Sequence, residues 1–391
     1  MSEWKKVKLG DVCQIIDGDR GKNYPKNHEF FGSGYCLFLN TGNVTKEGFS
    51  FANNQFITKE KDEVLRKGKI QRGDLILTTR GTVGNIAYYT NHIKYENVRI
   101  NSGMVILRVN KENVDASFLY QLVRSKESRT YINSFCTGSA QPQLPIKNLS
   151  QICFEIPSLS TQHRIATILS RYDSLIENYQ KQIKLLEEAA QRLYKEWFVD
   201  FHFPGYENAM IVDGVPEGWE KKKVGDMISK IQRTKQVTTN NYQASGKIPV
   251  IDQSRNYIAG YTDDAECLVR VTVPYIVFGD HTRILKYIPF SFAKGADGTQ
   301  LIMSNDLERM PQTLFYNSLI EIDLSNYSYA RHFKYLKEEF VLLPSEYIAR
   351  KYDSIVSRYY QSIQKSREQI RLLTEARDRL LPKLMSGEIT V

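Results

Sequence analysis

Two loop tips in the sequence carry side chains that suit the edges of nucleic-acid bases. Each tip lies between two short apolar runs, which predicts a strand, a loop and a second strand at 74–89 and again at 275–287. Arginine can donate two hydrogen bonds to guanine, asparagine can pair with adenine, and aspartate can accept from N4 of cytosine. The candidate residues are Thr79, Arg80 and Asn85 in the first tip, and Asp280, His281, Thr282 and Arg283 in the second. The alternative at either tip is an ordinary polar hairpin turn.

Further polar clusters in the same two segments contain residues that can reach phosphate oxygens or base edges. These residues are Arg20, Lys22, Asn43, Gln141, Arg233, Lys235, Arg255, Lys294, Arg331 and His332. Each cluster by itself is more often a solvated loop. Together they supply the donors that a nucleic-acid reader needs, so we predict that these residues bind DNA.

The sequence carries no recognisable catalytic motif. It contains no G-x-x-x-x-G-K-[ST] loop for ATP, no G-x-G-x-x-G fingerprint and no N-P-P-[YF] tetrapeptide, which amino-methyltransferases use to hold adenine. The E-x-K triplets at Glu3 and Glu220 lack a preceding acid-proline pair, so we interpret them as residues at the start of a fold. His281 and His332 have no second ligand at metal spacing. We therefore expect no catalytic residue, metal or cofactor in this chain, and any chemistry would belong to partners.

Length and composition limit the class of protein. The chain has 391 residues, which indicates two or three domains, and 41% hydrophobic with 25% charged residues is typical of a globular protein. A net charge of +9 is compatible with a polyanionic partner such as nucleic acid. The five cysteines are widely spread with no C-x-x-C pair, so we expect reduced thiols and no zinc site. We find no signal peptide and no run of about 18 apolar residues, and therefore expect a cytoplasmic protein without a membrane span.

The chain is internally duplicated. Residues 4–11 read WKKVKLGD, and residues 219–226 read WEKKKVGD, 215 positions later. A second match places 157–193 on 344–380 at an offset of 187 positions without a gap, with PS, SRY, QI, LL and RL recurring in register. The order is therefore a variable segment, a helix, a second variable segment and a second helix, in which the helices do the same job twice.

The repeated segments carry heptad patterns that predict coiled-coil helices. From Ile165 to Trp197 the apolar residues recur at spacings of 4 and 3 without interruption. This predicts a helix from about 162 to 198, roughly 55 Å long at 1.5 Å per residue. Ser160 or Thr161 is the expected N-cap.

The second helix keeps the pattern from Tyr352 to Leu380, although Ser366 and Arg377 interrupt it. Pro382 predicts that it ends near Leu381. The duplication predicts that the two helices pack against each other and run antiparallel. Large exposed residues on or beside the heptad pattern are expected to dock partner helices. They are Tyr172, Tyr179, Tyr194, Trp197 and Tyr359.

In combination, these motifs resemble the specificity (S) subunits of type I restriction-modification systems along essentially the whole chain. The residues that carry the resemblance are 4–11 and 218–226 at the repeat starts, 157–169 at the first helix entry, LYKEWFVDF at 193–201, and LPKLMSGEI at 381–389. Segments 279–283, 295–299 and 329–333 look like parts of the target recognition domains of that family.

The resemblance implies a fold and a set of partners. The fold class is α+β, internally duplicated, with two α/β target recognition domains separated by two long antiparallel coiled-coil helices. The expected borders are 1–155 for target recognition domain 1, 156–201 for the first helix, 202–218 for a linker, 219–340 for target recognition domain 2 and 341–391 for the second helix. The weaker second heptad pattern leaves the symmetry of partner docking open.

In this family each recognition domain reads one half of a bipartite double-stranded DNA target, and the helices set the spacing. The helices also recruit two methyltransferase subunits, which bind S-adenosylmethionine, and two restriction subunits can join and supply ATP- and Mg-dependent translocation and cleavage. The resemblance therefore implies a DNA-recognition subunit without its own catalysis. Two alternatives from other classes are a self-contained modification enzyme and a coiled-coil adaptor without a nucleic-acid role.

Overall fold

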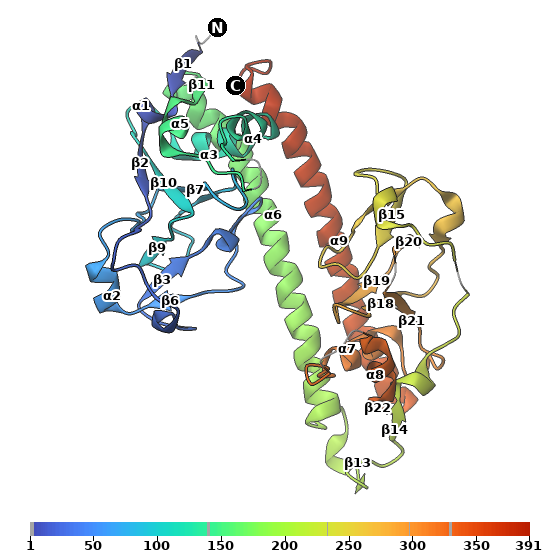
Figure 1. Ribbon diagram of the computed structural model, residues 1–391. Helices are drawn as coiled ribbons and strands as arrows, with labels where there is room; N and C mark the ends of the chain where they lie inside the picture. The colour runs from blue at the N-terminus through green and yellow to red at the C-terminus, as the bar shows by residue number, and fades with distance from the viewer. Residues whose placement is uncertain (1–3, 139–140, 233, 297, 328–330) are drawn as a thin grey trace. The chain divides into compact units, whose positions relative to one another are not determined.

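The computed structural model describes residues 4–138, 141–232, 234–296, 298–327 and 331–391. The chain forms two compact units (Figure 1). Unit 1 contains Met1–Glu177 and Ile370–Val391, and unit 2 contains Asn178–Gln369. Each unit holds one α+β domain and one stretch of each of the two long helices, α6 (Leu159–Tyr194) and α9 (Glu346–Met385).

The α+β domain of unit 1 is built on two small sheets. Its elements are β1 (Lys5–Lys8), α1 (Leu9–Val12), β2 (Cys13–Asp17), β3 (Cys36–Leu39), η2 (Thr41–Asn43), β4 (Val44–Thr45), β5 (Gly48–Phe49), β6 (Phe56–Ile57), α2 (Lys59–Val64), β7 (Leu75–Thr78), β8 (Ile86–Tyr88), β9 (Val98–Ile100), β10 (Met104–Val109), α3 (Ala116–Arg124), α4 (Lys126–Asn133), α5 (Ile146–Gln151) and β11 (Cys153–Ile156). One sheet has the order β2-β10-β7-β8 and the other β6-β3-β9. The predicted strand, loop and strand at 74–89 is confirmed as the antiparallel pair β7 and β8.

The α+β domain of unit 2 repeats this plan. Its elements are β12 (Ile211–Val212), β13 (Val215–Pro216), β14 (Glu220–Lys223), η5 (Val224–Met227), β15 (Ile248–Ile251), β16 (Gly260–Thr262), β17 (Leu268–Val269), β18 (Tyr275–Gly279), β19 (Leu285–Ile288), β20 (Phe292–Lys294), β21 (Thr299–Ile302), α7 (Gln312–Ile320), α8 (His332–Glu338) and β22 (Phe340–Leu343). Its sheets have the orders β19-β18-β21 and β16-β15-β20-β17. The second predicted hairpin is confirmed as β18 and β19.

The two units contain equivalent strand pairs, whose residues are separated by the two offsets of the sequence repeat. In unit 1, β1 pairs antiparallel with β11, and Lys5 lies opposite Ile156. In unit 2, β14 pairs antiparallel with β22, and Glu220 lies opposite Leu343. Glu220 follows Lys5 by 215 positions and Leu343 follows Ile156 by 187 positions, which are the two offsets of the repeat. The structure therefore confirms the duplicated α+β fold.

A glycine makes the same close contact in both copies. A side chain on Gly10 would place its Cβ 3.0 Å from the carbonyl oxygen of Ser150 on α5. A side chain on Gly225 would place its Cβ 3.1 Å from the carbonyl oxygen of Lys337 on α8. Because a backbone oxygen cannot move aside cheaply, the G-D motif of each repeat requires glycine for close packing.

Glu220, the acid of the second E-x-K triplet, has a structural role in unit 2. The Glu220 carboxylate accepts a hydrogen bond from Arg309 at 2.6 Å and forms an ion pair with Lys222 at 2.8 Å. These two cations lower the pKa of Glu220 to about 2. Arg309 also donates to the carbonyl oxygens of Gly218, Leu343 and Pro344, so this cluster ties the start of β14 to the end of β22.

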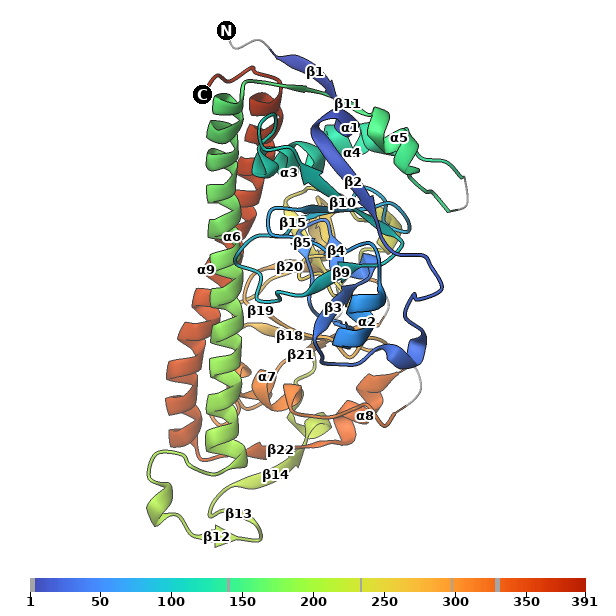
Figure 2. The same cartoon turned by 90° about the vertical axis from the view of Figure 1, so that its left-hand side faces the viewer.

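The two long helices run antiparallel within each unit (Figure 2). In unit 1, Asp173 of α6 contacts Arg377 of α9, and Arg164 donates to the carbonyl oxygen of Val391 at 3.1 Å. In unit 2, Glu187 contacts Arg367 at 3.0 Å, and Tyr352 donates to the carbonyl oxygen of Ala190 at 3.3 Å. In both units the residue numbers rise on one helix as they fall on the other. Ile165, Leu169, Ile176 and Ala190 are buried at predicted heptad positions of α6, whereas Tyr172 and Tyr179 at such positions are half-buried.

The helix ends differ from the predictions. The first helix begins at Leu159, and the hydroxyl of Ser158 accepts from the backbone N–H of Thr161, so Ser158 rather than Ser160 or Thr161 lies at its start. The second helix continues through Pro382 to Met385. Proline removes the hydrogen bond to the carbonyl of Asp378, which lies in the last turns of the helix. Ser386 still donates to the carbonyl of Pro382 at 2.9 Å, which closes the last turn.

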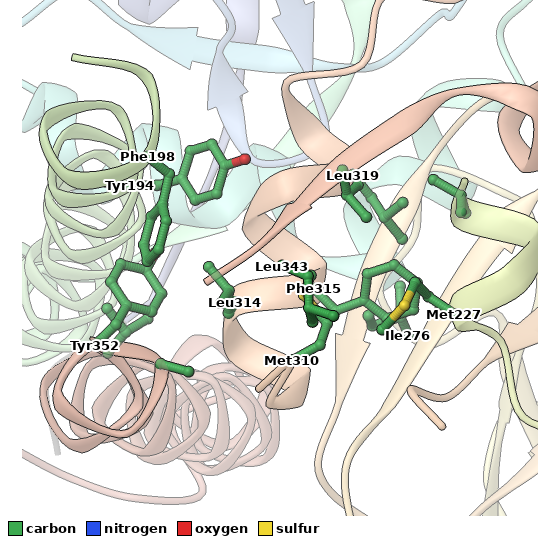
Figure 3. Close-up of a cluster of buried hydrophobic side chains, with 14 of the residues drawn as sticks. Tyr194, Phe198, Met227, Ile276, Met310, Leu314, Phe315, Leu319, Leu343 and Tyr352 are labelled. Atoms are coloured by element: carbon green, nitrogen blue, oxygen red, sulfur yellow. The ribbon is translucent and has the colours of Figure 1, made fainter. Parts of the chain in front are cut away.

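Each unit has its own hydrophobic core. In unit 2, α7 contributes Leu314 and Phe315, which lie buried between the sheet residue Ile276 and the aromatic side chains of the long helices (Figure 3). Burying a side chain of this size stabilises the fold by roughly 1.5–3 kcal/mol. In unit 1, the corresponding core joins α3 and β10 to the α6 residues Ile165 and Leu169. The α+β domain of each unit is therefore fixed to its helix stretch by a continuous core.

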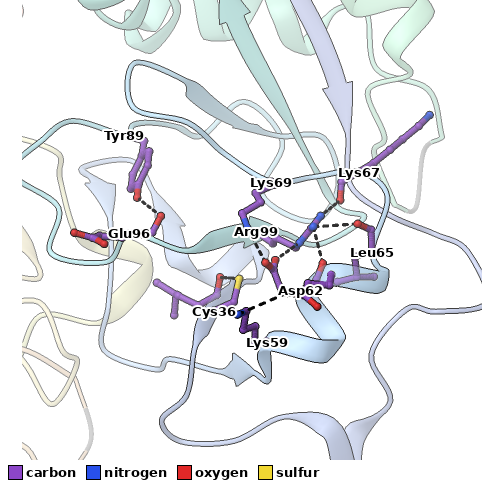
Figure 4. A network of polar contacts seen from close by, with 11 residues as sticks. Cys36, Lys59, Asp62, Leu65, Lys67, Lys69, Tyr89, Glu96 and Arg99 are labelled. Atoms are coloured by element: carbon purple, nitrogen blue, oxygen red, sulfur yellow. Dashed lines mark hydrogen bonds and ion pairs between the residues drawn. The ribbon is translucent and has the colours of Figure 1, made fainter.

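A buried ion-pair network joins α2 to β9 in unit 1 (Figure 4). Arg99 on β9 donates to the carboxylate of Asp62 at 2.5 Å and to the carbonyl oxygens of Leu65 and Lys67 at 3.0 and 2.7 Å. Lys69 donates to the same carboxylate at 2.6 Å. Burial alone would raise the pKa of Asp62, but these cations hold it below its ordinary value. The network anchors α2 to β9 and keeps the Asp62 carboxylate, which is 3% exposed, out of contact with solvent.

Candidate nucleic-acid interface

Three loops of unit 1 meet at one edge of its sheets. The loops 40–43, 79–85 and 101–103 form what we call loop cluster 1. Strands β3 and β9 run parallel, so the loops that follow them leave at the same edge, and β7 ends beside the start of β10 because those strands are antiparallel. The backbone N–H groups of Thr79 and Arg80 both donate to the carbonyl of Gly103, at 2.9 and 3.2 Å. A side chain on Gly103 would meet Thr41 at 2.8 Å, so the three loops are in contact.

Four predicted DNA-binding residues are exposed around loop cluster 1. Arg80 projects from the second loop and has an exposed side chain. Arg20 donates to the carbonyl of Ser102 and to Asp17, both at 3.2 Å, which brings its own loop beside the third loop. Lys22 is exposed on the same loop as Arg20, and Gln141 is exposed on a segment whose Gln143 forms a β-bridge with Arg80.

A buried carboxylate shapes the loop that carries Arg20 and Lys22. Asp19 accepts hydrogen bonds from the backbone N–H groups of Gly21 at 2.7 Å and Arg66 at 2.8 Å. The bond from Gly21 is the largest influence, and together these donors lower the pKa of Asp19. Asp19 therefore stays ionised and presents the two cations on a fixed turn.

Three other predicted residues of unit 1 have structural roles, and the structure corrects those predictions. Asn43 is 2% exposed, and its amide donates to the carbonyls of Ser50 and Asn53 at 3.0 Å each. Thr79 is buried and donates to the carbonyl of Gly103 at 3.1 Å. Asn85 is 8% exposed, donates to the carbonyl of Val44 and accepts from Arg129 at 2.8 Å. Their polar groups hold the loops together and do not face solvent.

Unit 2 contains a second cluster of three loops in the same topological positions. Loop cluster 2 consists of the loops 252–256, 280–284 and 295–298, of which Asp297 lies outside the described residues. The backbone N–H of Asp280 donates to the carbonyl of Gly298 at 2.7 Å. Gln253 accepts from the backbone N–H of His281 at 3.0 Å, and its carbonyl accepts from the hydroxyl of Thr282 at 2.7 Å. The side chains of His281 and Thr282 are exposed, as are those of Arg255 and Arg331 nearby in the fold.

A buried lysine supports loop cluster 2. Lys286 on β19 is 5% exposed and donates to the carbonyls of Asp252 at 2.7 Å and Asn256 at 2.5 Å. Burial lowers its pKa to about 8, although Asp252 opposes the shift. Lys286 therefore holds both ends of the loop 252–256 by hydrogen bonds. The sequence analysis missed this residue, and its one signal was a lysine inside the otherwise apolar strand 284–288.

Of three further predicted residues in unit 2, Asp280 is buried, whereas Arg283 and Lys235 are exposed and stay predictions. Asp280 is 7% exposed, and its carboxylate accepts from the backbone N–H of Phe333 at 2.8 Å, which anchors the start of α8. Arg283 has a left-handed backbone with φ 62° and donates to the carbonyl of Leu324 at 3.0 Å. Lys235 forms ion pairs with Asp264 and Glu266, which raise its pKa. All three residues make contacts within unit 2, and only the Asp280 carboxylate is buried by them.

The last three predicted residues of unit 2 are His332, Lys294 and Arg233. His332 is 6% exposed, and its backbone N–H donates to the carbonyl of Asp280 at 2.9 Å. Lys294 is half-buried at the end of β20. Arg233 lies outside the described residues. His332 is therefore corrected to a core position, and Lys294 stays a prediction.

The aromatic residues predicted to dock partner helices fall into two groups. Tyr194 and Trp197 are 7% and 8% exposed, and both ring systems pack on Tyr352 within unit 2. The expectation that they are exposed is wrong, because Tyr194 at the end of α6 faces the core (Figure 3) and Trp197 in the following turn, η3 (Lys195–Val199), is buried as well. Tyr172, Tyr179 and Tyr359 are half-buried on the long helices and keep some surface that a partner can contact.

The part of the chain that the structure describes holds no group of three metal-ligating side chains. Within that same part, no helix combines the length and the apolar character needed to cross a bilayer.

A duplicated α+β fold with one exposed, partly cationic loop cluster in each copy defines a two-part recognition protein. Comparison with known proteins agrees with this class. Residues 1–188 match the family model described as the type I restriction modification DNA specificity domain. The chain is 28% identical to the type I restriction enzyme MjaIX specificity subunit of Methanocaldococcus jannaschii, over 100% of this chain and 94% of that protein.

Two further comparisons agree with these matches. The type I restriction enzyme HindI specificity subunit of Haemophilus influenzae is 29% identical over 51% of this chain and 42% of that protein. The crystal structure of a type I restriction-modification S subunit from M. genitalium has the same fold, with a TM-score of 0.59 and 16% identity over 98% of this chain and 96% of that one. Residues 1–188 thus carry a type I restriction modification DNA specificity domain, and over its whole length the chain is similar to a type I specificity subunit.

Proposed function

We propose that loop cluster 1 and loop cluster 2 each read one half of a bipartite double-stranded DNA target. The observation that carries this proposal is that two homologous domains present loops from the same three topological positions, with different side chains on them. A duplicated scaffold with divergent loops suits two different half-sites, because the scaffold fixes geometry while the loop residues choose the bases.

The long helices suit the task of fixing the distance between half-sites. α6 has 36 residues and α9 has 40, so each is roughly 54–60 Å long at 1.5 Å per residue. Rigid helices of this length can hold two readers at a constant separation along DNA. The half-buried aromatic residues Tyr172, Tyr179 and Tyr359 offer contact surface for two methyltransferase subunits.

The chain supplies recognition, and its partners supply chemistry. The absence of catalytic motifs from the sequence supports a subunit without its own activity. S-adenosylmethionine would bind to the methyltransferase subunits, and ATP and Mg to two restriction subunits where those join. The net charge of the chain, +9, favours the approach of DNA to the complex, with or without restriction subunits.

Methylation mapping tests the proposal. The chain is co-expressed with its methyltransferase subunit, and the host genome is sequenced for methyladenine. A single split motif with a fixed gap is the expected result. Methylation at a continuous motif would mean that one loop cluster is not a reader. Methyl transfer by the purified chain alone would instead support a self-contained modification enzyme.

A further inference from the structure

The two loop clusters can be matched residue by residue through equivalent backbone contacts and strand registers. Thr79 donates to the carbonyl of Gly103 in unit 1, and Asp280 donates to the carbonyl of Gly298 in unit 2. Gly103 directly precedes β10, and Gly298 directly precedes the corresponding strand β21. Asp280 is therefore the counterpart of Thr79, and the next residue, His281, is the counterpart of Arg80.

The third loop of each cluster supports the same match. Beside Gly103 lie Thr41 and Arg80, whose side-chain carbons would be 2.8 and 3.9 Å from an added Cβ. Beside Gly298 lie Gln253 and His281, whose side-chain atoms would be 2.6 and 2.7 Å from an added Cβ. Thr41 and Gln253 each stand two residues after the end of their strand, β3 or β15. Arg80 and His281 likewise stand two residues after β7 or β18.

We infer that this single position in each cluster carries a base-reading side chain, Arg80 for one half-site and His281 for the other. The inference rests on the proposed function and adds to it which residues choose the bases. Both side chains are exposed, and both start where three loops meet, so the backbone beneath them is held by contacts from three directions. A side chain that starts from a fixed backbone can discriminate between bases, because its donors have a defined direction.

Each predicted loop tip contains an arginine, Arg80 or Arg283, but the structural match makes His281 the counterpart of Arg80. Arg283 stands two positions beyond His281, has a left-handed backbone and donates to the carbonyl of Leu324. One nitrogen of its guanidinium is therefore held by the backbone of unit 2, although the residue is exposed. Residue type alone would match Arg80 with Arg283, because both tips contain an arginine. The number of residues after the strand instead matches Arg80 with His281, since each stands two residues after its strand.

The two reading side chains predict different half-sites. The guanidinium of Arg80 can donate two hydrogen bonds to O6 and N7 of one guanine. The imidazole of His281 offers a ring nitrogen as donor or acceptor, so it reads a base edge through fewer bonds. Gln253 is a positioning residue for His281, because its side-chain oxygen accepts the backbone N–H of that residue. The half-site read by unit 1 should therefore contain a strictly required guanine.

The test compares the methylated motifs of four variants with that of the wild type. Arg80→Ala and His281→Ala change the two reading positions. His92→Ala and Arg270→Ala are matched controls, because both residues are exposed and lie at the opposite ends of their sheets, after β8 and after β17. We expect Arg80→Ala to relax one position of one half-site, His281→Ala to relax one position of the other, and the controls to keep the wild-type motif. Loss of a good base contact should lower discrimination roughly 10-fold to 100-fold.

Selection from a randomised duplex pool by the purified complex repeats the test without relying on activity in cells. His281→Asn keeps a polar side chain, so it serves as a second variant in case His281→Ala fails to assemble with its partner subunits. If the wild type yields a split motif and His281→Ala keeps both halves intact, the inference about His281 is wrong and the two-reader function stands. If the wild type yields no split motif, the proposed function itself fails and the inference falls with it. Equal weakening of both half-sites by Arg80→Ala would also overturn the inference, because it would identify a phosphate contact.

Discussion

Asp173 on α6 and Arg377 on α9 form an ion pair at 2.8 Å at the place where the second heptad pattern breaks. The same carboxylate accepts from Arg124 at 2.9 Å and from Gln121 at 2.6 Å, both on α3. The interrupting arginine is thus satisfied inside unit 1. Asp173 joins the recognition domain of that unit to both helix stretches.

Asp173→Ala should destabilise unit 1. The substitution leaves Arg124 and Arg377, whose side chains are 10% and 12% exposed, without their shared carboxylate. Loss of one partner of a buried pair costs about 3–5 kcal/mol, and the partial exposure of Asp173 reduces this to about 1–3 kcal/mol. Urea unfolding measures the change, with the exposed neighbour Ser174→Ala as control. Equal free energies of unfolding for the two variants would contradict the role of Asp173.

The duplication predicts that one substitution has the same effect at two distant positions. Gly10→Ala and Gly225→Ala each bring a Cβ to 3.0 or 3.1 Å from a backbone oxygen of the helix packed against it. Each should lower stability by about 1–3 kcal/mol, because close-packed backbone must shift. Gly32→Ala is the control, since nothing lies within 4 Å of an added Cβ there. Thermal unfolding of the three variants decides the matter, and a loss at only one of the two sites would argue against equivalent packing.

Residue patterns alone predict the scaffold far better than the interface. The offsets between Trp4 and Trp219 and between Pro157 and Pro344 anticipate which strands pair, because pairing at the repeat starts depends on local motifs. Contacts such as that of Thr41 with Gly103 join residues about 60 positions apart, and nothing in either segment signals them. Polar residue type was a poor guide for Asn43, because buried loops need the same amides that DNA readers use.

Arg283→Gly should leave the recognised motif unchanged. A glycine adopts φ 62° without strain, which stabilises the fold by roughly 1 kcal/mol, and the lost hydrogen bond to the carbonyl of Leu324 costs about as much. The variant therefore separates a structural arginine from a reading one. Methylation mapping supplies the measurement, and thermal unfolding should differ little from the wild type. Loss of one half-site in this variant would return Arg283 to the interface.

Lys286 predicts a pH dependence of stability. Its pKa is about 8 in the folded chain, below the ordinary lysine value of about 10.4 that applies after unfolding. Between these two values the unfolded chain binds more protons than the folded chain, so the contribution of Lys286 to the free energy of unfolding rises with pH. Below pH 8 both states are charged, and the cost of burying the ammonium group is constant.

Lys286→Met removes this dependence while keeping a side chain of similar length. The free energy of unfolding of the wild type relative to Lys286→Met should therefore increase between pH 8 and pH 10, and should be flat between pH 6 and pH 7. The exposed Lys247→Met is the matched control and should follow the wild type across the whole range. Urea unfolding at four pH values provides the curves. Parallel curves for the wild type and Lys286→Met would show that the amine is hydrated in the folded chain, and that the loop 252–256 is held by other contacts.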